Sequence, residues 1–178
     1  MDLLSEFEAQ ARRVGATVHR CPPQNAATES LKLLRQAGCA SVALAANLPQ
    51  RSAFVAALSS EDLAETSTST LWPTRRADGG ISLARLGVAE TGSVLLHSSS
   101  EDRRVELCVD LHLVLLETTS LVATLDQAFA VLREIGARPP AYASLVSGPS
   151  RSADIERTLT IGVHGPRELY IVLVGAGP

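Results

Sequence analysis

Residue types suited to anion binding and proton transfer are concentrated near the C-terminal end of the chain. The segment Ser147–Glu156 reads SGPSRSADIE, and it follows an apolar run at 142–146 that predicts a buried strand. The residues 153–159 predict a short helix. A strand, a Gly/Ser turn and a helix start form an anion cradle, because free backbone N–H groups and the positive helix end converge there. The residues expected to line this cradle are Ser147, Gly148, Ser150, Arg151 and Asp154.

Two further segments carry polar or conformationally special residues. His164 and Arg167 belong to the segment 162–167, which also contains two glycines and a proline and comes just before the last apolar run. The imidazole titrates near neutral pH, and a guanidinium pairs with a carboxylate or phosphate. The turn at 89–93 has a carboxylate, two hydroxyls and a glycine, contributed by Glu90, Thr91, Gly92 and Ser93.

These three segments form one pocket only if the fold brings them together. In an open α/β sheet, ligands bind beyond the carboxyl ends of the strands, and 147–154 follows a strand and is placed for this. The turn at 89–93 qualifies only if 81–88 is also a strand. The segment with His164 and Arg167 precedes the final strand and must fold back across the sheet edge. A pocket so formed would bind an anion and move a proton.

Other interpretations of these residues remain open. The two C-terminal segments can be ordinary surface loops whose glycines and prolines set turns. Ser150, Asp154 and His164 also occur in the order of a hydrolase triad, but Ser150 is not in a GxSxG elbow. The other three histidines show no metal-ligand spacing, and no GxGxxG follows a strand, so neither a metal nor a dinucleotide is expected.

The rest of the chain alternates between helical and strand patterns. This alternation predicts an α/β fold with a mainly parallel sheet flanked by helices, in one domain that covers residues 1–178. Less regular stretches are 63–71 (a loop or an edge strand), 77–80 (a turn), 81–88 (a strand or one helical turn) and 98–104 (a polar loop). We expect helices at 3–14, from Asn25 toward Gly38, at 51–58 and at 124–136, and strands at 16–21, 41–46, 94–97, 111–116 and 169–174.

Composition narrows the class of protein. The 178 residues are 46% hydrophobic and 20% charged, which is typical of a globular chain. A net charge of −3 with 3% aromatic residues disfavours nucleic-acid binding. No apolar run is long enough to cross a bilayer, so we expect a cytoplasmic protein. Three isolated cysteines, Cys21, Cys39 and Cys108, offer no CxxC and are expected to be buried small hydrophobes.

Three segments together resemble the LUD-domain family of the LutC/YkgG type. They are Gly87–Leu96, Ser147–Glu156 and Gly162–Leu169, and their order and spacing agree with that family over roughly 78–175. The resemblance implies a fold like that of sugar-phosphate isomerases and CoA-transferases (NagB/RpiA-like). It also implies a role in oxidising L-lactate to pyruvate, with iron–sulfur clusters carried by partner proteins and no cofactor in this chain.

Three functional hypotheses follow from the residues and the resemblance. The first is a non-redox component of lactate utilisation that binds a small organic acid or anion through Arg151, His164 and Arg167. The second is an independent enzyme acting on a sugar phosphate or acyl-CoA, with Glu90 as base or nucleophile and His164 as a catalytic partner. The third is a scaffold or regulatory protein without a small ligand.

Overall fold

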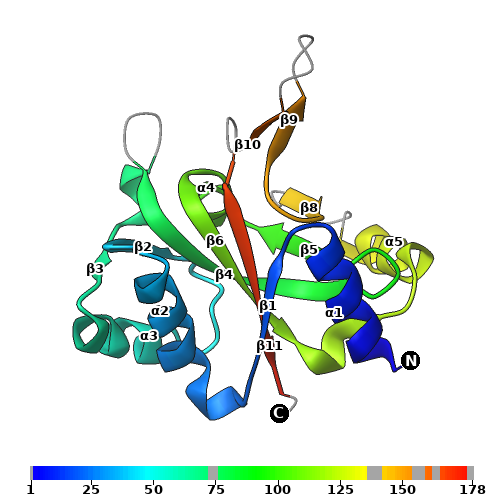
Figure 1. Cartoon of the computed structure of the whole chain (residues 1–178), viewed down its shortest axis with the longest axis horizontal. Coiled ribbons are helices and arrows are strands. Elements are labelled where there is room, and N and C mark those ends of the chain that lie inside the picture. The colour runs from blue at the N-terminus through cyan, green and yellow to red at the C-terminus, as the bar shows by residue number, and fades with distance from the viewer. Residues whose placement is uncertain (1, 72–75, 136–141, 154–158, 162–164, 176–178) are drawn as a thin grey trace.

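The computed structural model describes residues 2–71, 76–135, 142–153, 159–161 and 165–175 (Figure 1). The α-helices are α1 (Leu3–Arg13), α2 (Ala26–Gln36), α3 (Arg51–Leu58), α4 (Asp102–Leu107) and α5 (Leu125–Ile135). The strands are β1 (Thr17–Cys21), β2 (Ser41–Leu44), β3 (Ala64–Glu65), β4 (Ala77–Val88), β5 (Ser93–Ser98), β6 (Val109–Glu117), β7 (Leu121–Val122), β8 (Tyr142–Val146), β9 (Arg151–Ala153), β10 (Leu159–Ile161) and β11 (Glu168–Val174). Short 3-10 turns are η1 (Pro23–Asn25), η2 (Ser59–Glu61), η3 (Thr68–Thr70) and η4 (Thr118–Ser120).

The centre of the molecule is a parallel sheet in the order β1-β11-β6-β4-β2-β3. All five neighbouring pairs along this path are parallel. Every residue of β6 from Leu111 to Leu116 is buried, and all of them except His112 are apolar, as expected for a strand covered on both faces. The predicted α/β class with a mainly parallel sheet is confirmed.

An antiparallel extension continues from the long strand β4. Its second half pairs with β5, and β5 pairs in turn with β8, both antiparallel. The strand β8 is confirmed, but the prediction that it is buried is wrong: Tyr142 is 46% exposed and Leu145 is 38% exposed. Among the described strands β8 pairs only with β5, so one of its edges lacks the cover that a central strand has.

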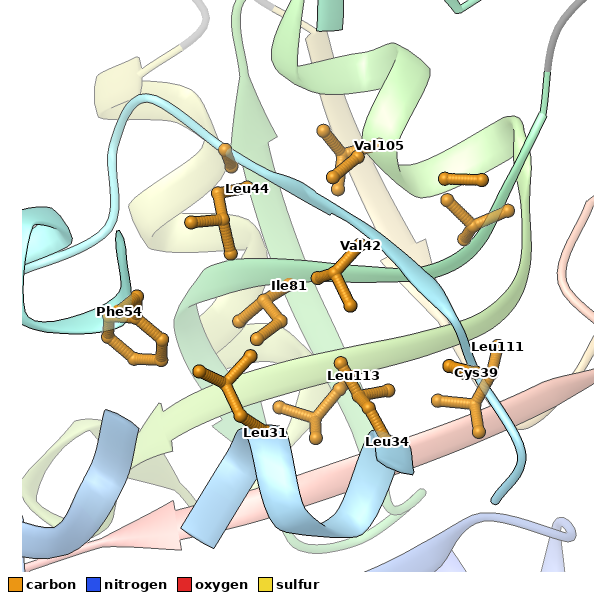
Figure 2. Packing of buried hydrophobic residues seen from close by; sticks show 14 of the residues in the cluster. Leu31, Leu34, Cys39, Val42, Leu44, Phe54, Ile81, Val105, Leu111 and Leu113 are labelled. Carbon is orange, nitrogen blue, oxygen red and sulfur yellow. The ribbon is translucent and has the colours of Figure 1, made fainter. Parts of the chain in front are cut away.

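Alternate residues of the central strands face two separate hydrophobic clusters. Leu113 and Leu115 pack with Leu31 of α2 and Phe54 of α3, as Figure 2 shows for Leu31, Phe54 and Leu113. Val114 and Leu116 pack instead with Phe7 and Ala11 of α1. Because side chains alternate across a strand, α2 and α3 cover one face of the sheet and α1 covers the other. A third cluster joins α5 to β4 and β5.

Several predicted boundaries are wrong for tertiary reasons. Residues 77–80, expected as a turn, begin strand β4, because Gly79 and Gly80 pair with both β2 and β6. The polar stretch 98–104, expected as a loop, contains the start of α4, where the Ser99 hydroxyl accepts a hydrogen bond from the N–H of Asp102, the first residue of the helix. Residues 81–88, for which a strand or a helical turn was expected, form part of a strand. Within 63–71, for which a loop or an edge strand was expected, Ala64–Glu65 forms a short edge strand.

The helix predicted over 153–159 is wrong at both of its ends. Ala153 belongs to β9 and Leu159 to β10, and these two strands pair antiparallel. The intervening residues 154–158 lie outside the described residues, and so does Asp154. No helix begins in the part of this stretch that the structure describes, 147–153 and 159–161, so the anion cradle expected from helix geometry has no helix start there to support it.

The three cysteines behave as predicted. Cys21, Cys39 and Cys108 are free thiols and are all buried. Burial raises the pKa of Cys39 to about 11, so this thiol stays protonated at neutral pH. None of the helices in the described part of the chain is both long and apolar enough to span a bilayer.

Candidate functional site

A chain of hydroxyl groups links two of the three polar segments. The Thr91 Oγ1 and Ser93 Oγ atoms are 2.8 Å apart, and the Ser93 and Ser147 Oγ atoms are 2.5 Å apart. Ser93 is only 1% exposed, so its hydroxyl satisfies its hydrogen bonds inside the protein. The turn after β4 and the segment after β8 therefore meet, as the pocket hypothesis requires.

The third segment joins the same region through backbone contacts. The Ser150 N–H donates to the Pro166 carbonyl over 2.9 Å. The Arg167 N–H donates to the Asp110 carbonyl just before the buried part of β6, over 2.7 Å. The fold thus brings 91–93, 147–150 and 165–167 together, whereas His164 lies outside the described residues.

The position of this cluster in the sheet differs in part from the one expected. Asp110 and Arg167 lie at the amino ends of β6 and β11, and Val14, which contacts Gly148, precedes β1. The segment follows β8 in sequence, but β8 runs antiparallel to β5, which itself reverses direction relative to β4. Strand β8 therefore runs in the same direction as the second half of β4, and the turn at 89–93 and the segment after β8 follow the carboxyl ends of these two strands. The hydrogen bonds to Pro166 and Asp110 place the same segments at the amino ends of β11 and β6, which the sequence did not predict.

Two glycines of the motifs make room for the first helix. Gly92 has φ of 64°, and a Cβ placed there would lie 2.1 Å from the Ala11 nitrogen in α1. Gly148 has φ of 76°, and its Cβ would lie 2.2 Å from the Val14 carbonyl oxygen. Both positions need the left-handed conformation and the absence of a side chain. Packing against α1 and its C-terminal end explains these glycines without a bound anion.

The charged residues of the motifs also have structural partners. The Arg151 guanidinium donates to the Val14 carbonyl over 3.0 Å and so binds the C-terminal end of α1. The Glu90 carboxylate accepts a hydrogen bond from the Leu125 N–H over 3.0 Å, at the first residue of α5. This carboxylate thereby satisfies one of the free N–H groups at a helix start. A role for Glu90 as base or nucleophile stays a prediction.

A cavity of about 160 Å³ lies against this cluster. It is small beside the roughly 300–1,000 Å³ of pockets that hold drug-sized ligands, so it suits only a small molecule. The three family segments contribute Leu96, Gly148, Pro149, Ser150, Gly165, Pro166 and Leu169 to its lining. The remaining lining residues come from α4, β6 and β8: Glu106, Leu107, His112, Ser144 and Val146.

Two ionisable residues of this cavity were not among the predicted site residues. His112 is 1% exposed, its Nε2 atom lies 2.8 Å from the Ser82 Oγ, and burial lowers its pKa to about 4. Glu106 is 6% exposed, and burial raises the pKa of its carboxyl. The only sequence signal for His112 was a polar residue inside a continuous apolar strand. The cavity thus holds an imidazole that is neutral at pH 7 and a carboxyl whose pKa is raised by burial.

The hydroxyl chain makes a prediction about stability. Ser93→Ala removes a buried hydroxyl that hydrogen bonds to both Thr91 and Ser147, and we expect a loss of about 1–2 kcal/mol in the free energy of unfolding. Ser147→Ala should cost less, because Ser147 is exposed to water. Urea unfolding of both single variants and the double variant measures the coupling, expected near 1 kcal/mol. Strictly additive losses would contradict a hydrogen bond between these residues.

Within the described ranges, no group of three or more His, Cys, Asp or Glu side chains is placed to hold a metal ion. The side chains at the cluster offer hydroxyls, guanidinium groups, an imidazole and carboxyls. Such groups can bind a small organic acid and hold or move a proton.

Comparisons with known proteins agree with the three-segment resemblance. Lactate utilization protein C of Shouchella clausii is 40% identical over 101 residues, which cover 54% of this chain and 44% of that protein. Lactate utilization protein C of Bacillus subtilis is 35% identical over 103 residues, covering 56% and 43% of the two chains. An uncharacterised protein of Neisseria meningitidis is 37% identical over 98 residues, covering 54% and 42%. The chain thus spans less than half the length of these relatives.

The fold has a counterpart among solved structures. A DUF162 family protein from Deinococcus radiodurans superposes with a TM-score of 0.64 at 22% identity, over 97% of this chain and 96% of that one. The model of the LUD domain matches residues 4–174, so it also includes the N-terminal part, where no family segment had been identified. With nearly the whole chain matched, the protein belongs to the LUD-domain family.

Proposed function

We propose that this protein is a non-redox component of a lactate-utilisation system and binds a small organic acid or anion. Relatives named lactate utilization protein C, at 31–40% identity, support the role. The observation that carries the binding proposal is the convergence of the three family segments on one cavity of about 160 Å³. A cavity of that size favours a ligand with few heavy atoms.

The charge for such a ligand would come from residues next to the cavity. Ser150 and Pro166 line it, and Arg151 and Arg167 follow them directly in the sequence. Arg151 uses one guanidinium nitrogen for the Val14 carbonyl and keeps other N–H groups for a carboxylate. We propose His164 as the group that exchanges a proton with the bound acid, because a free imidazole titrates near neutral pH.

The electrons of lactate oxidation require an acceptor. Conversion of L-lactate to pyruvate removes a pair of electrons together with a pair of protons, and we assign the electrons to iron–sulfur partner proteins. Cys21, Cys39 and Cys108 are free thiols buried in one hydrophobic cluster of this chain. In this arrangement the chain binds and positions the acid or the partners, and the partners carry the clusters.

Two measurements test this proposal. The first is a thermal-shift titration with L-lactate, pyruvate, glycolate, phosphate, sugar phosphates and CoA esters. At a hundredfold excess over the dissociation constant, a ligand should stabilise the fold by about 2.7 kcal/mol. Arg151→Ala and Arg167→Ala should each reduce the shift caused by hydroxy acids. Arg133→Ala, on the exposed side of α5, is the matched control and should leave the shift unchanged.

The second measurement is co-purification of the tagged protein from cells grown on lactate. The proposal predicts iron–sulfur proteins in the eluate, with the visible absorption of their clusters. If no small acid shifts the melting temperature and no iron–sulfur protein co-purifies, the lactate role is wrong. A shift with sugar phosphates or CoA esters alone would instead favour an independent enzyme.

A further inference from the structure

A second polar cavity lies at the opposite, carboxyl end of the parallel strands. Its volume is about 300 Å³, and we call it the carboxyl-edge cavity. Asn47 follows β2, and Glu117 is the last residue of β6. Ligands of open α/β sheets bind in this position, outside the carboxyl ends of the strands. The complete lining is Asn47, Leu83, Ala84, Arg85, His97, Glu117 and Ser120.

A break in strand pairing sets the position of Arg85. Ala84 pairs with Leu96 but Leu86 pairs with Leu95, so Arg85 is an extra residue in β4 with no partner in β5. Such β-bulges bend a strand and re-aim a side chain, and they are frequent next to binding sites. The bulge places a guanidinium at the cavity, on a strand that is held on both sides by other strands over its first half.

His97 supplies a ring nitrogen that lacks a partner. Its Nε2 atom is buried and makes no hydrogen bond to any residue that the structure describes. A buried polar atom without a partner costs about 1–3 kcal/mol, and native proteins rarely leave one unsatisfied. His97 also lines the carboxyl-edge cavity, but its Nε2 atom has almost no accessible surface, so a ligand there can provide the missing hydrogen bond only after the imidazole ring rotates toward the cavity.

A buried carboxylate holds the wall of this cavity in place. The Asp102 Oδ1 accepts a hydrogen bond from the Ala46 N–H over 2.6 Å, beside Asn47. Its Oδ2 accepts a hydrogen bond from the Ser99 hydroxyl over 3.1 Å, just after β5 and its His97. Asp102 is 5% exposed and thus ties the loop after β2 to the end of β5. It acts as a positioning residue for the groups on both sides.

We propose that the carboxyl-edge cavity binds a small monocarboxylate with a hydrogen-bond donor on the carbon next to the carboxylate. The Arg85 guanidinium matches a carboxylate in bidentate geometry. The Glu117 carboxylate accepts a hydrogen bond from the donor and repels a second negative charge on the ligand. His97, Asn47 and Ser120 complete the polar contacts. Phosphates and dicarboxylates are therefore disfavoured relative to a monoanion.

An adjoining apolar cavity extends the site. It has a volume of about 180 Å³, shares Leu83 and Glu117 with the carboxyl-edge cavity, and includes Ala53, Phe54 and Val174. A ligand whose carboxylate lies at Arg85 can direct a short apolar chain into this space. This site is separate from the cavity at the family segments, and it does not depend on the proposed role in lactate utilisation.

Isothermal titration calorimetry of the full chain tests the proposal. L-Lactate and glycolate represent hydroxy acids, L-alanine and glycine represent amino acids, and acetate, phosphate and succinate are the probes expected to bind weakly. Arg85→Ala should weaken binding about 10- to 100-fold, which is the usual effect of losing a charged hydrogen bond. Arg133→Ala is the control for loss of an exposed arginine and should bind as the wild type does.

Glu117→Gln provides a readout that a merely structural residue would not give. It removes the repulsion of a second negative charge, so binding of succinate and phosphate should strengthen while binding of hydroxy acids or amino acids weakens. In ¹⁵N NMR spectra the His97 Nε2 resonance should move on addition of the ligand. Preference for either the hydroxy acids or the amino acids identifies which donor the site accepts.

Clear results would overturn this inference. One is the absence of binding by every donor-bearing monocarboxylate. Another is binding that Arg85→Ala leaves unchanged while Arg151→Ala abolishes it, which would place the ligand at the family segments instead. Because Arg85 is exposed, its variant is expected to fold, and its melting curve verifies this.

Discussion

Gly92→Ala is expected to lower the free energy of unfolding by about 2–5 kcal/mol. The left-handed backbone costs a non-glycine residue about 1–2 kcal/mol. The new methyl group would also lie 2.1 Å from the Ala11 nitrogen and 2.4 Å from the Gln10 carbonyl carbon. These atoms belong to the backbone of α1, which cannot rotate away as a side chain can. Overpacking of this kind adds about 1–3 kcal/mol, so the turn must separate from α1 or the helix must shift.

Gly38→Ala is the matched control. Gly38 also has a positive φ, of 88°, but a Cβ there has no atom within 4 Å. It should therefore show only the backbone cost of about 1–2 kcal/mol. Urea unfolding followed by circular dichroism measures both variants. Equal losses for the two would mean that the contact of Gly92 with α1 contributes nothing, contrary to the packing described here.

The second large effect concerns pH. Burial lowers the pKa of His112 to about 4, whereas an unfolded histidine titrates near 6.5. The folded state therefore binds this proton less well than the unfolded state. The part of the free energy of unfolding that depends on a neutral His112 is fully present above about pH 6.5 and is lost as the pH falls toward 4. At about 1.4 kcal/mol per pKa unit, roughly 3 kcal/mol of stability should disappear over this window.

His112→Gln isolates this contribution. The amide can still hydrogen bond to the Ser82 hydroxyl, which lies 2.8 Å from the His112 Nε2, but it does not titrate. The free energies of unfolding of both proteins should be measured at several pH values between 7 and 4. Wild type should lose stability more steeply than the variant as the pH falls, because only wild type gains the imidazole proton on unfolding. Parallel curves would show that His112 titrates normally in the folded protein.

The two cavities differ in how far their residues could be predicted from the sequence. The family segments were visible because their residue types are unusual and their order is specific. The carboxyl-edge cavity was not, since Asn47, Arg85, His97 and Glu117 come from separate elements and each is ordinary where it stands in the sequence. Strand pairing decides that Arg85 is an extra residue in β4, and no local pattern around Arg85 reveals it.

Local patterns sufficed for most of the elements. Helix α3 occupies Arg51–Leu58 as predicted, and β1, β2, β6 and β11 lie where apolar runs indicated strands. Side-chain periodicity depends on the local backbone and on one buried face, so the sequence contains it directly. The failures lie where pairing partners decide the conformation, as at 77–80, where Gly79 and Gly80 lie between β2 and β6.

The α/β class, the strand and helix pattern and the three family segments are encoded locally by residue type and periodicity, so they could be predicted without coordinates. The contacts that these segments make became visible only in the folded chain. Gly92 and Gly148 accommodate α1, and Arg151 binds the end of that helix. Only the backbone hydrogen bonds of Ser150 and Arg167 showed that the segment after β8 meets the amino ends of β11 and β6, because contacts between segments far apart in the sequence leave no local pattern.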